Sequence, residues 1–191
     1  MIKNSLYILI SILFLYSCEG SKKTKTETQF KSIIDNVIGK ELFLPDNMTI
    51  YKPFNNYTYD SLEVISSKLK ITTFINASCG SCISEINRWE SFSKELAKFN
   101  VPVLLIFESN DQFELLHYLC ETGTVANSSF PFFMDIKNEY LINNSFMKTT
   151  NSMRTVLVDD KNKILLIGNP IKSDKIKDMY IKEIVKIANS K

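Results

Sequence analysis

Two cysteines separated by two residues lie at the junction between a predicted strand and a predicted helix. Residues 71–76 (Ile-Thr-Thr-Phe-Ile-Asn) are typical of a buried strand, and Cys79-Gly80-Ser81-Cys82 follows almost at once. Beyond Cys82, apolar residues recur at the helical period as far as about residue 98; they are Ile83, Ile86, Trp89, Phe92 and Leu96. A chain built in this way must place both thiols in the first turn of a helix, at one edge of a sheet.

Strand and helix patterns alternate along the rest of the chain. They predict strands over residues 101–107, 130–134, 155–158 and 163–167, and helices over residues 111–120, 140–146 and 173–187. Alternation implies parallel crossovers, and the last two strands form a hairpin that adds antiparallel strands to the same sheet. The pattern therefore predicts a three-layer α/β/α domain with a central mixed sheet. Upstream, residues 42–44 and 50–51 are expected to form a short N-terminal hairpin.

Composition restricts the class of protein further. The chain has 191 residues, of which 45% are hydrophobic, and a formal net charge of +2. These values fit one globular domain with short appendages and exclude a disordered chain. With 5 Gly and 5 Pro it is neither collagen-like nor of low complexity, and the charge is too small to predict binding to nucleic acid.

The N-terminal segment is typical of a secretory signal. Lys3 is followed by the apolar residues 6–16, and the small residue Ser17 directly precedes Cys18. The apolar run is shorter than the roughly 20 residues that span a bilayer. Leu15-Tyr16-Ser17-Cys18 resembles the bacterial lipobox, which implies cleavage before Cys18, lipidation of that cysteine and anchoring to a membrane of the cell envelope.

Three regions follow from this interpretation. Residues 1–17 are the lipoprotein signal peptide. Residues 18–36 contain a polar tether and the start of an N-terminal helix, whose apolar spacing begins at Phe30 and stops before Gly39. Residues 37–191 form the folded domain.

The position of Cys79 and Cys82 favours thiol–disulfide chemistry. The amides and dipole of a helix N-terminus stabilise a thiolate, so the pKa of the first cysteine should fall towards neutrality. The second cysteine, one turn further on, is close enough to attack a mixed disulfide and release the product. We therefore expect Cys79 to be the attacking thiolate and Cys82 the resolving thiol of a redox-active disulfide.

Several local features resemble the thioredoxin superfamily, and within it the extracytoplasmic thiol-disulfide oxidoreductases of the TlpA and ResA type. They are Gly39-Lys40 with Leu44-Pro45-Asp46, the strand and Cys-x-x-Cys motif of residues 72–85, and residues 130–140 and 155–167. The resemblance covers residues 37–188 and implies a thioredoxin fold with an N-terminal hairpin extension. It also implies exchange with protein thiols and disulfides and a membrane or thioredoxin-like electron donor, without a cofactor or metal. Glu85 matches the family's acidic position, where it would tune the pair or move a proton; an exposed helix carboxylate is the alternative.

The chain departs from that family at four positions around the pair. Ser78 stands where Trp is usual, Ser81 where Pro is common, and Thr73 where cytosolic thioredoxins have a buried acid. The loop that normally carries a cis-proline maps to about Met153 and has no proline. Because cis peptides without proline cost about 2.5–4 kcal/mol, we expect a trans loop of different shape, with altered partner binding and slower or narrower exchange.

Thiol–disulfide exchange is not the only function that a chain with this cysteine pair could have. His117 and Cys120 would complete a formal four-ligand zinc set with Cys79 and Cys82, but they end the next helix and should lie too far away. Alone, Cys120 is expected to pack as a small apolar residue. Copper carriers of the Sco type do not match, because they space their cysteines by three residues and have a late histidine. Peroxidases do not match either, because they do not use this paired motif. A non-catalytic lipoprotein that binds a partner or peptide, with Cys79–Cys82 as a structural disulfide, remains an alternative.

Overall fold

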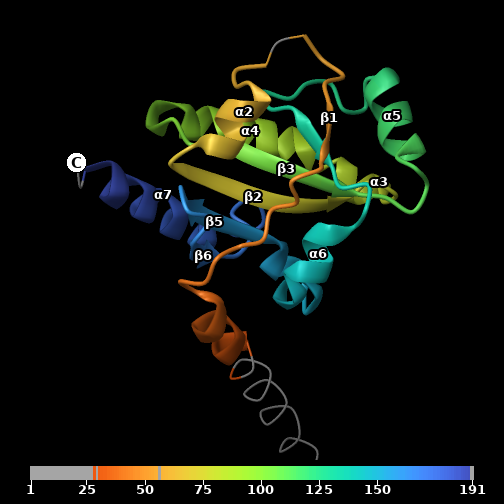
Figure 1. Ribbon diagram of the computed structural model, residues 1–191. Helices are drawn as coiled ribbons and strands as arrows, with labels where there is room; N and C mark the ends of the chain where they lie inside the picture. The colour runs from red at the N-terminus through yellow and green to blue at the C-terminus, as the bar shows by residue number, and fades with distance from the viewer. Residues whose placement is uncertain (1–27, 29, 56, 190–191) are drawn as a thin grey trace, which may run out of the picture. The chain divides into compact units, whose positions relative to one another are not determined.

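The structure is a computed structural model that describes residue 28 and residues 30–55 and 57–189 (Figure 1). The predicted signal peptide, Cys18 and the first part of the tether lie outside the described residues. The chain divides into two compact units, Met1–Val37 and Ile38–Lys191. In the first unit, residues 30–37 are helical, as their apolar spacing predicts.

The second unit is built on a six-stranded mixed sheet with the order β1-β4-β3-β2-β5-β6. Its strands are β1 (Thr49–Tyr51), β2 (Leu69–Asn76), β3 (Val103–Glu108), β4 (Phe132–Met134), β5 (Thr155–Asp159) and β6 (Ile164–Ile167). The three strands β2, β3 and β4 are parallel, while β1, β5 and β6 each run antiparallel to a neighbour. The predicted parallel crossovers and closing hairpin are confirmed.

Helices pack on both faces of this sheet (Figure 1). They are α2 (Ser61–Ser66), α3 (Gly80–Ile83), α4 (Ile86–Leu96), α5 (Glu114–Glu121), α6 (Glu139–Asn143) and α7 (Asp174–Asn189), with short 3-10 helices at Ala97–Phe99, Ser145–Lys148 and Asn151–Arg154. Lys177 of α7 pairs with Glu95 of α4, so these two helices lie side by side. On α6, the buried hydroxyl of Tyr140 lies 2.9 Å from that of Thr72 on β2. The α/β class with three layers is therefore confirmed.

The centre of the sheet forms the core because its strands are almost wholly apolar or β-branched. Every residue of β2 except Asn76, and every residue of β3 except Glu108, is buried. The helix α4 adds Trp89, Phe92 and Leu96, which lie on one face of the helix and are buried. The strand that leads to the cysteines is thus held from both sides and both faces.

The helix predicted from Cys82 to about residue 98 is broken. Helix α3 ends at Ile83 and α4 begins at Ile86. At the break, the Ser84 hydroxyl donates to the Ser81 carbonyl at 2.7 Å, and the Glu85 amide bonds to the carbonyl of Cys82, three residues back. These bonds tighten the turn, so Cys82 lies in a short helix that is separate from α4, with Cys79 at its N-cap.

Two helices differ from the prediction. Helix α5 begins at Glu114 rather than residue 111, because Gln112 and Phe113 both have left-handed backbones with φ of 55° and 66°. Helix α2 was not predicted, because a six-residue helix with exposed Leu62 has no clear apolar period. Its sequence signal is the capping box formed by Asp60 and Glu63.

The N-terminal hairpin is corrected by the structure. Residues 42–44 and 50–51 do not pair with each other. Glu41 forms an isolated antiparallel bridge with Lys163 beside β6, whereas β1 pairs with β4 at the other edge, where Ile50 faces Phe133. The segment therefore runs from one edge of the sheet to the other and satisfies backbone groups at both.

Within the described part of the chain, no helix has the length and apolar character needed to cross a membrane.

Candidate functional site

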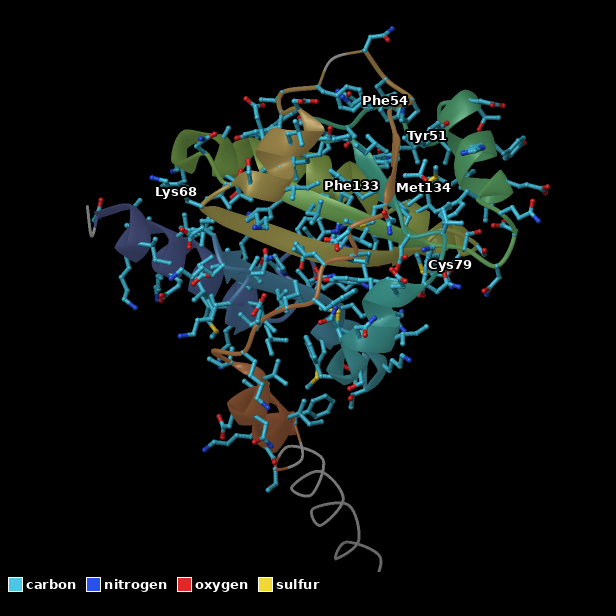
Figure 2. All side chains as sticks on the ribbon, viewed as in Figure 1. Tyr51, Phe54, Lys68, Cys79, Phe133 and Met134 are labelled. Atoms are coloured by element: carbon cyan, nitrogen blue, oxygen red, sulfur yellow. A yellow bond between two sulfur atoms is a disulfide. The ribbon has the colours of Figure 1, made fainter. Side chains whose placement is uncertain are left out.

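The two cysteines form a disulfide directly after β2, with their Cα atoms 5.2 Å apart. Lys68 directly precedes this strand and Cys79 lies three residues beyond its other end, so their labels show where the strand begins and where it leads (Figure 2). The turn between strand and disulfide is held by Asn76, whose side-chain oxygen accepts from the Ser78 amide at 2.9 Å and whose carbonyl accepts from the Cys79 amide at 3.3 Å. Asn76 therefore fixes the direction in which the disulfide leaves the sheet.

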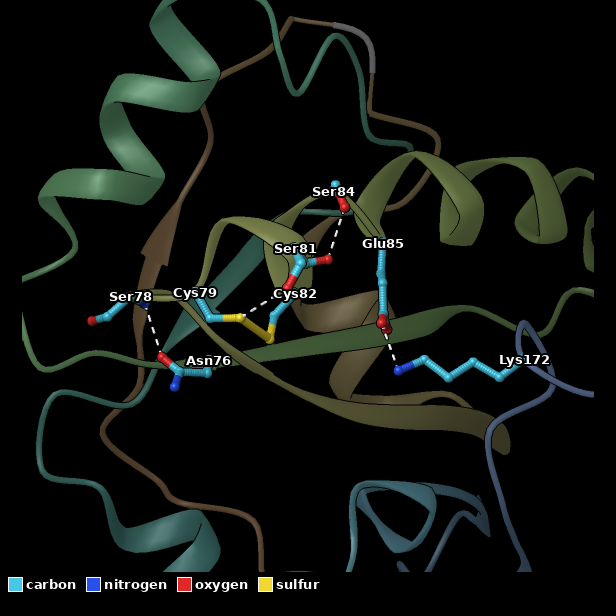
Figure 3. The surroundings of a disulfide bond; sticks show 8 residues. All are labelled: Asn76, Ser78, Cys79, Ser81, Cys82, Ser84, Glu85 and Lys172. Carbon is cyan, nitrogen blue, oxygen red and sulfur yellow. Dashed lines mark hydrogen bonds and ion pairs between the residues drawn. A yellow bond between two sulfur atoms is a disulfide. The ribbon is translucent and has the colours of Figure 1, made fainter.

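Cys79 occupies the N-cap position of α3, and its carbonyl accepts from the amides of Cys82 and Ile83 at 2.9 and 3.0 Å. The hydroxyl of Ser81 lies 3.3 Å from Cys79 Sγ (Figure 3). A disulfide sulfur has no hydrogen to donate, so the Ser81 hydroxyl is the donor. Both cysteines are half-buried, and Gly80 and Ser81 between them are exposed. The disulfide is consequently open to an approaching thiol.

Ser78 ties the disulfide turn to the loop between β3 and α5. Its hydroxyl donates to Asp111 Oδ1 at 2.9 Å and accepts from the Asn110 amide at 2.8 Å. Ser109 also bonds to the Asp111 carboxylate. The bonds from Ser109 and, to a smaller extent, Ser78 lower the pKa of Asp111. This network is a polar clamp between the disulfide turn and the loop that leads to α5.

Glu85 lies on the other side of the disulfide, at the start of α4. Its carboxylate pairs with Lys172 Nζ at 2.6 Å (Figure 3). Cys82 and Glu85 line one small cleft of about 40 Å³, whose other charged residues are Arg154 and Lys172. The structure thus brings together Cys79, Cys82 and Glu85, the three residues that the sequence singled out in this domain.

The loop opposite the disulfide is a 3-10 helix, Asn151–Arg154, in which Met153 is buried. As predicted, it has no cis peptide; none occurs in the part of the chain that the structure describes. Arg154 and Lys172 were not predicted as site residues, because each joins the cleft from a segment more than 65 residues away in the sequence. Arg154 directly precedes β5 and follows Met153, the position to which the cis-proline maps. This place in the sequence was the one signal that could have identified Arg154 as a site residue.

On β2, position 73 carries no buried acid, as the sequence shows. Two hydroxyl groups lie there instead. Thr73 and Thr155 are buried, and their Oγ1 atoms lie 2.7 Å apart. One strand over, Glu108 is the register partner of Asn76. Burial, followed by the charge of Asp135, raises the pKa of Glu108. Glu108 is therefore a second half-buried carboxyl group at the same end of the sheet, and sequence analysis missed it.

His117 and Cys120 lie apart from the disulfide. The His117 ring packs on Tyr51 of β1 with centroids 4.6 Å apart, and two strands separate β1 from β2. Among the described residues, no three His, Cys, Asp or Glu side chains are grouped as metal ligands. Burial, and secondarily Glu121, raises the pKa of Cys120 to about 11, so it stays a protonated thiol at neutral pH.

Comparison with solved structures identifies the fold. The crystal structure of a protein described as thiol:disulfide interchange protein DsbE, from Chlorobium tepidum, matches with a TM-score of 0.54 and 14% identity, over 77% of this chain and 99% of that one. The solution structure of a protein described as a disulfide isomerase, from Bacteroides thetaiotaomicron, matches with a TM-score of 0.50 and 18% identity, over 80% and 90%. No protein-family model and no curated protein sequence matches. The chain has a thioredoxin-like fold, as its sequence predicts.

The Ser81 hydroxyl offers a direct test of the site's electrostatics. A hydrogen bond to a thiolate is stronger than one to a disulfide sulfur, so Ser81→Ala should destabilise the reduced pair. We expect the reduction potential to become more negative by about 20 mV, close to 1 kcal/mol. Ser84→Ala, which removes the neighbouring hydroxyl and its bond to the Ser81 carbonyl, is the control. An equal shift in both variants would contradict a specific contact of Ser81 with the sulfur.

Proposed function

We propose that this protein is a thiol-disulfide oxidoreductase of the bacterial cell envelope that exchanges disulfides with protein substrates through Cys79 and Cys82. The observation that carries the proposal is an accessible disulfide at the start of a helix, with a hydroxyl donor on Cys79 Sγ, in a thioredoxin-like fold. The helix amides and Ser81 both favour a thiolate at Cys79. The names of the two matched structures agree with this chemistry.

In the oxidising direction, a substrate thiolate attacks Cys79 Sγ. The Cys79–Cys82 bond breaks, a mixed disulfide forms between the substrate and Cys79, and Cys82 leaves as a thiolate that takes up a proton. A second substrate thiolate attacks the substrate sulfur and releases Cys79. Two electrons pass from the substrate dithiol to the pair. In the reverse direction, Cys79 attacks a substrate disulfide, Cys82 resolves it, and a membrane or thioredoxin-like donor re-reduces the pair.

Glu85 is proposed to move the proton of Cys82. The two side chains line the same cleft, and Lys172 holds the Glu85 carboxylate in place at 2.6 Å. When Cys82 attacks, the Glu85 carboxylate in this cleft accepts the thiol proton, and when Cys82 leaves, the protonated carboxyl group returns it without a large rearrangement.

The segment before the domain is proposed to be a lipid anchor. The lipobox-like residues 15–18 imply that Cys18 becomes the lipidated N-terminus, with the domain facing the periplasm or the exterior.

Trapping with Cys82→Ser tests the exchange chemistry. Without the resolving thiol, the reduced variant should accumulate a mixed disulfide with a disulfide-containing peptide, detected by intact mass and removed by dithiothreitol. Cys79→Ser should react only at the background rate, and Cys120→Ser should behave as the wild type because Cys120 is a protonated, half-buried thiol. If the native disulfide resists strong reductants and no variant traps peptide, the protein is instead a binding lipoprotein with a structural disulfide.

Glu85→Gln should slow the step in which Cys82 resolves a mixed disulfide, by about tenfold. This is less than the 10²–10⁴ typical of positioned acid–base groups, because water can enter the cleft. The pH dependence of that step should flatten. Glu95→Gln removes a similar ion pair from the same helix, with Lys177, and should leave the step unchanged. Equal effects of both substitutions would assign Glu85 a merely structural role.

Cys18→Ser should abolish incorporation of labelled palmitate and leave an unprocessed chain. The measurement is labelling in a bacterial host followed by gel fluorography. Continued labelling of the Cys18→Ser chain would disprove the anchor.

A further inference from the structure

The cleft beside the disulfide carries one positive charge that has no ion-pair partner among the described residues. It is lined by three charged residues, Glu85, Arg154 and Lys172. Lys172 and Glu85 neutralise each other at 2.6 Å. Arg154 has no carboxylate within 4.0 Å among the described residues. The charge that remains in the cleft therefore belongs to Arg154.

Arg154 is held in place without using its main hydrogen-bonding groups. Its guanidinium carbon lies 5.0 Å from the centroid of the Phe74 ring, a distance typical of a cation–π contact. Its Nε donates to the Met147 carbonyl at 3.5 Å. Within the described part of the chain, neither terminal nitrogen has a hydrogen-bond acceptor. The side chain is thus positioned on an aromatic surface while its two terminal amino groups are left available.

Glu108 is a charged group that interacts with Arg154, and it also interacts with Asp135 and Lys148. The positive charges of Lys148 and Arg154 both act on the half-buried carboxyl group of Glu108, but neither forms an ion pair with it. Burial raises the pKa of Glu108, while the charges of Lys148 and Arg154 act in the opposite direction. Glu108 therefore interacts with Arg154 only through space, and among the described residues it does not occupy the terminal nitrogens of the guanidinium.

We propose that Arg154 is a specificity-determining residue that binds a carboxylate of the substrate, so that the pair reacts preferentially with cysteines flanked by Asp or Glu. This inference rests on the proposed exchange function. A guanidinium binds a carboxylate through two parallel hydrogen bonds. The cleft, of about 40 Å³, suits one such group rather than a larger part of a substrate.

The position of the cleft matches the geometry of a mixed disulfide. The attacked atom is Cys79 Sγ, and the bonded Cys82 lines the cleft with Arg154. The residue next to the substrate cysteine has its Cα only 3.8 Å from that of the cysteine. We therefore expect a carboxylate on this residue to enter the cleft next to Cys82 while the substrate sulfur is joined to Cys79.

The test uses the oxidised full-length protein and three capped peptides that differ only in the residue before a single cysteine, Glu, Gln or Lys. Reduction of the Cys79–Cys82 disulfide is followed by acid quenching and mass-tagging of free thiols. Because a neighbouring charge changes the reactivity of the peptide thiol itself, each rate is divided by the rate of the same peptide with hydroxyethyl disulfide.

Wild-type protein should prefer the Glu peptide over the Gln peptide by about three- to fivefold, the effect of one partly exposed ion pair, and should disfavour the Lys peptide. The preference should shrink with added salt. It should vanish in Arg154→Gln and persist in part in Arg154→Lys. The control Lys161→Gln removes one positive charge from the turn at the far end of the sheet and should keep the preference.

The outcomes separate this inference from the proposed function. Equal normalised rates for all three peptides with wild-type protein, or an unchanged preference in a folded Arg154→Gln variant, would overturn the role of Arg154 while leaving exchange intact. Circular dichroism shows whether the variants fold, and Arg154→Lys keeps the test decisive if Arg154→Gln does not. No reaction with any peptide would overturn the proposed function itself.

Discussion

The burial of β2 at the centre of the sheet is the constraint on which the site depends. Parallel pairing with β3 and antiparallel pairing with β5 hold this strand along its length, and its side chains are buried up to Asn76. At that residue the hydrogen bonding changes from the sheet to a turn, in which Asn76 holds the amides of Ser78 and Cys79. The disulfide is therefore presented by a buried central strand that pairs on both sides, and its chemistry is set by what surrounds that end of the strand.

Those surroundings differ on the two sides of the disulfide. On the Cys79 side, Ser78 and Asp111 clamp the loop that leads to α5. On the Cys82 side, Glu85, Lys172 and Arg154 form a charged cleft. The 3-10 helix Asn151–Arg154, opposite the disulfide, has neither a proline nor a cis peptide. This arrangement is consistent with a pair whose exchange is governed by local charge.

Most of the fold could be predicted from the sequence, because its strands and helices have clear periods and the cysteines mark a strand-to-helix junction. The errors come from elements too short to show a period, such as α2, or from backbone bonds made by polar side chains, such as the break at Ser84. The prediction of an N-terminal hairpin was wrong because residues 49–51 carry no signal that distinguishes pairing with a neighbour in the sequence from pairing with β4. Cys79, Cys82 and Glu85 share a local motif and were found, whereas Arg154 and Lys172 join them only through the tertiary fold.

The most direct test of the account is the reduction potential of the purified protein, measured by equilibration in redox buffers and mass-tagging of free thiols. The account predicts a reversible two-electron Cys79–Cys82 couple between about −120 and −300 mV, the range of exchange-active pairs. A disulfide that resists reduction well below this range, or a pair that never oxidises, would contradict an exchange function.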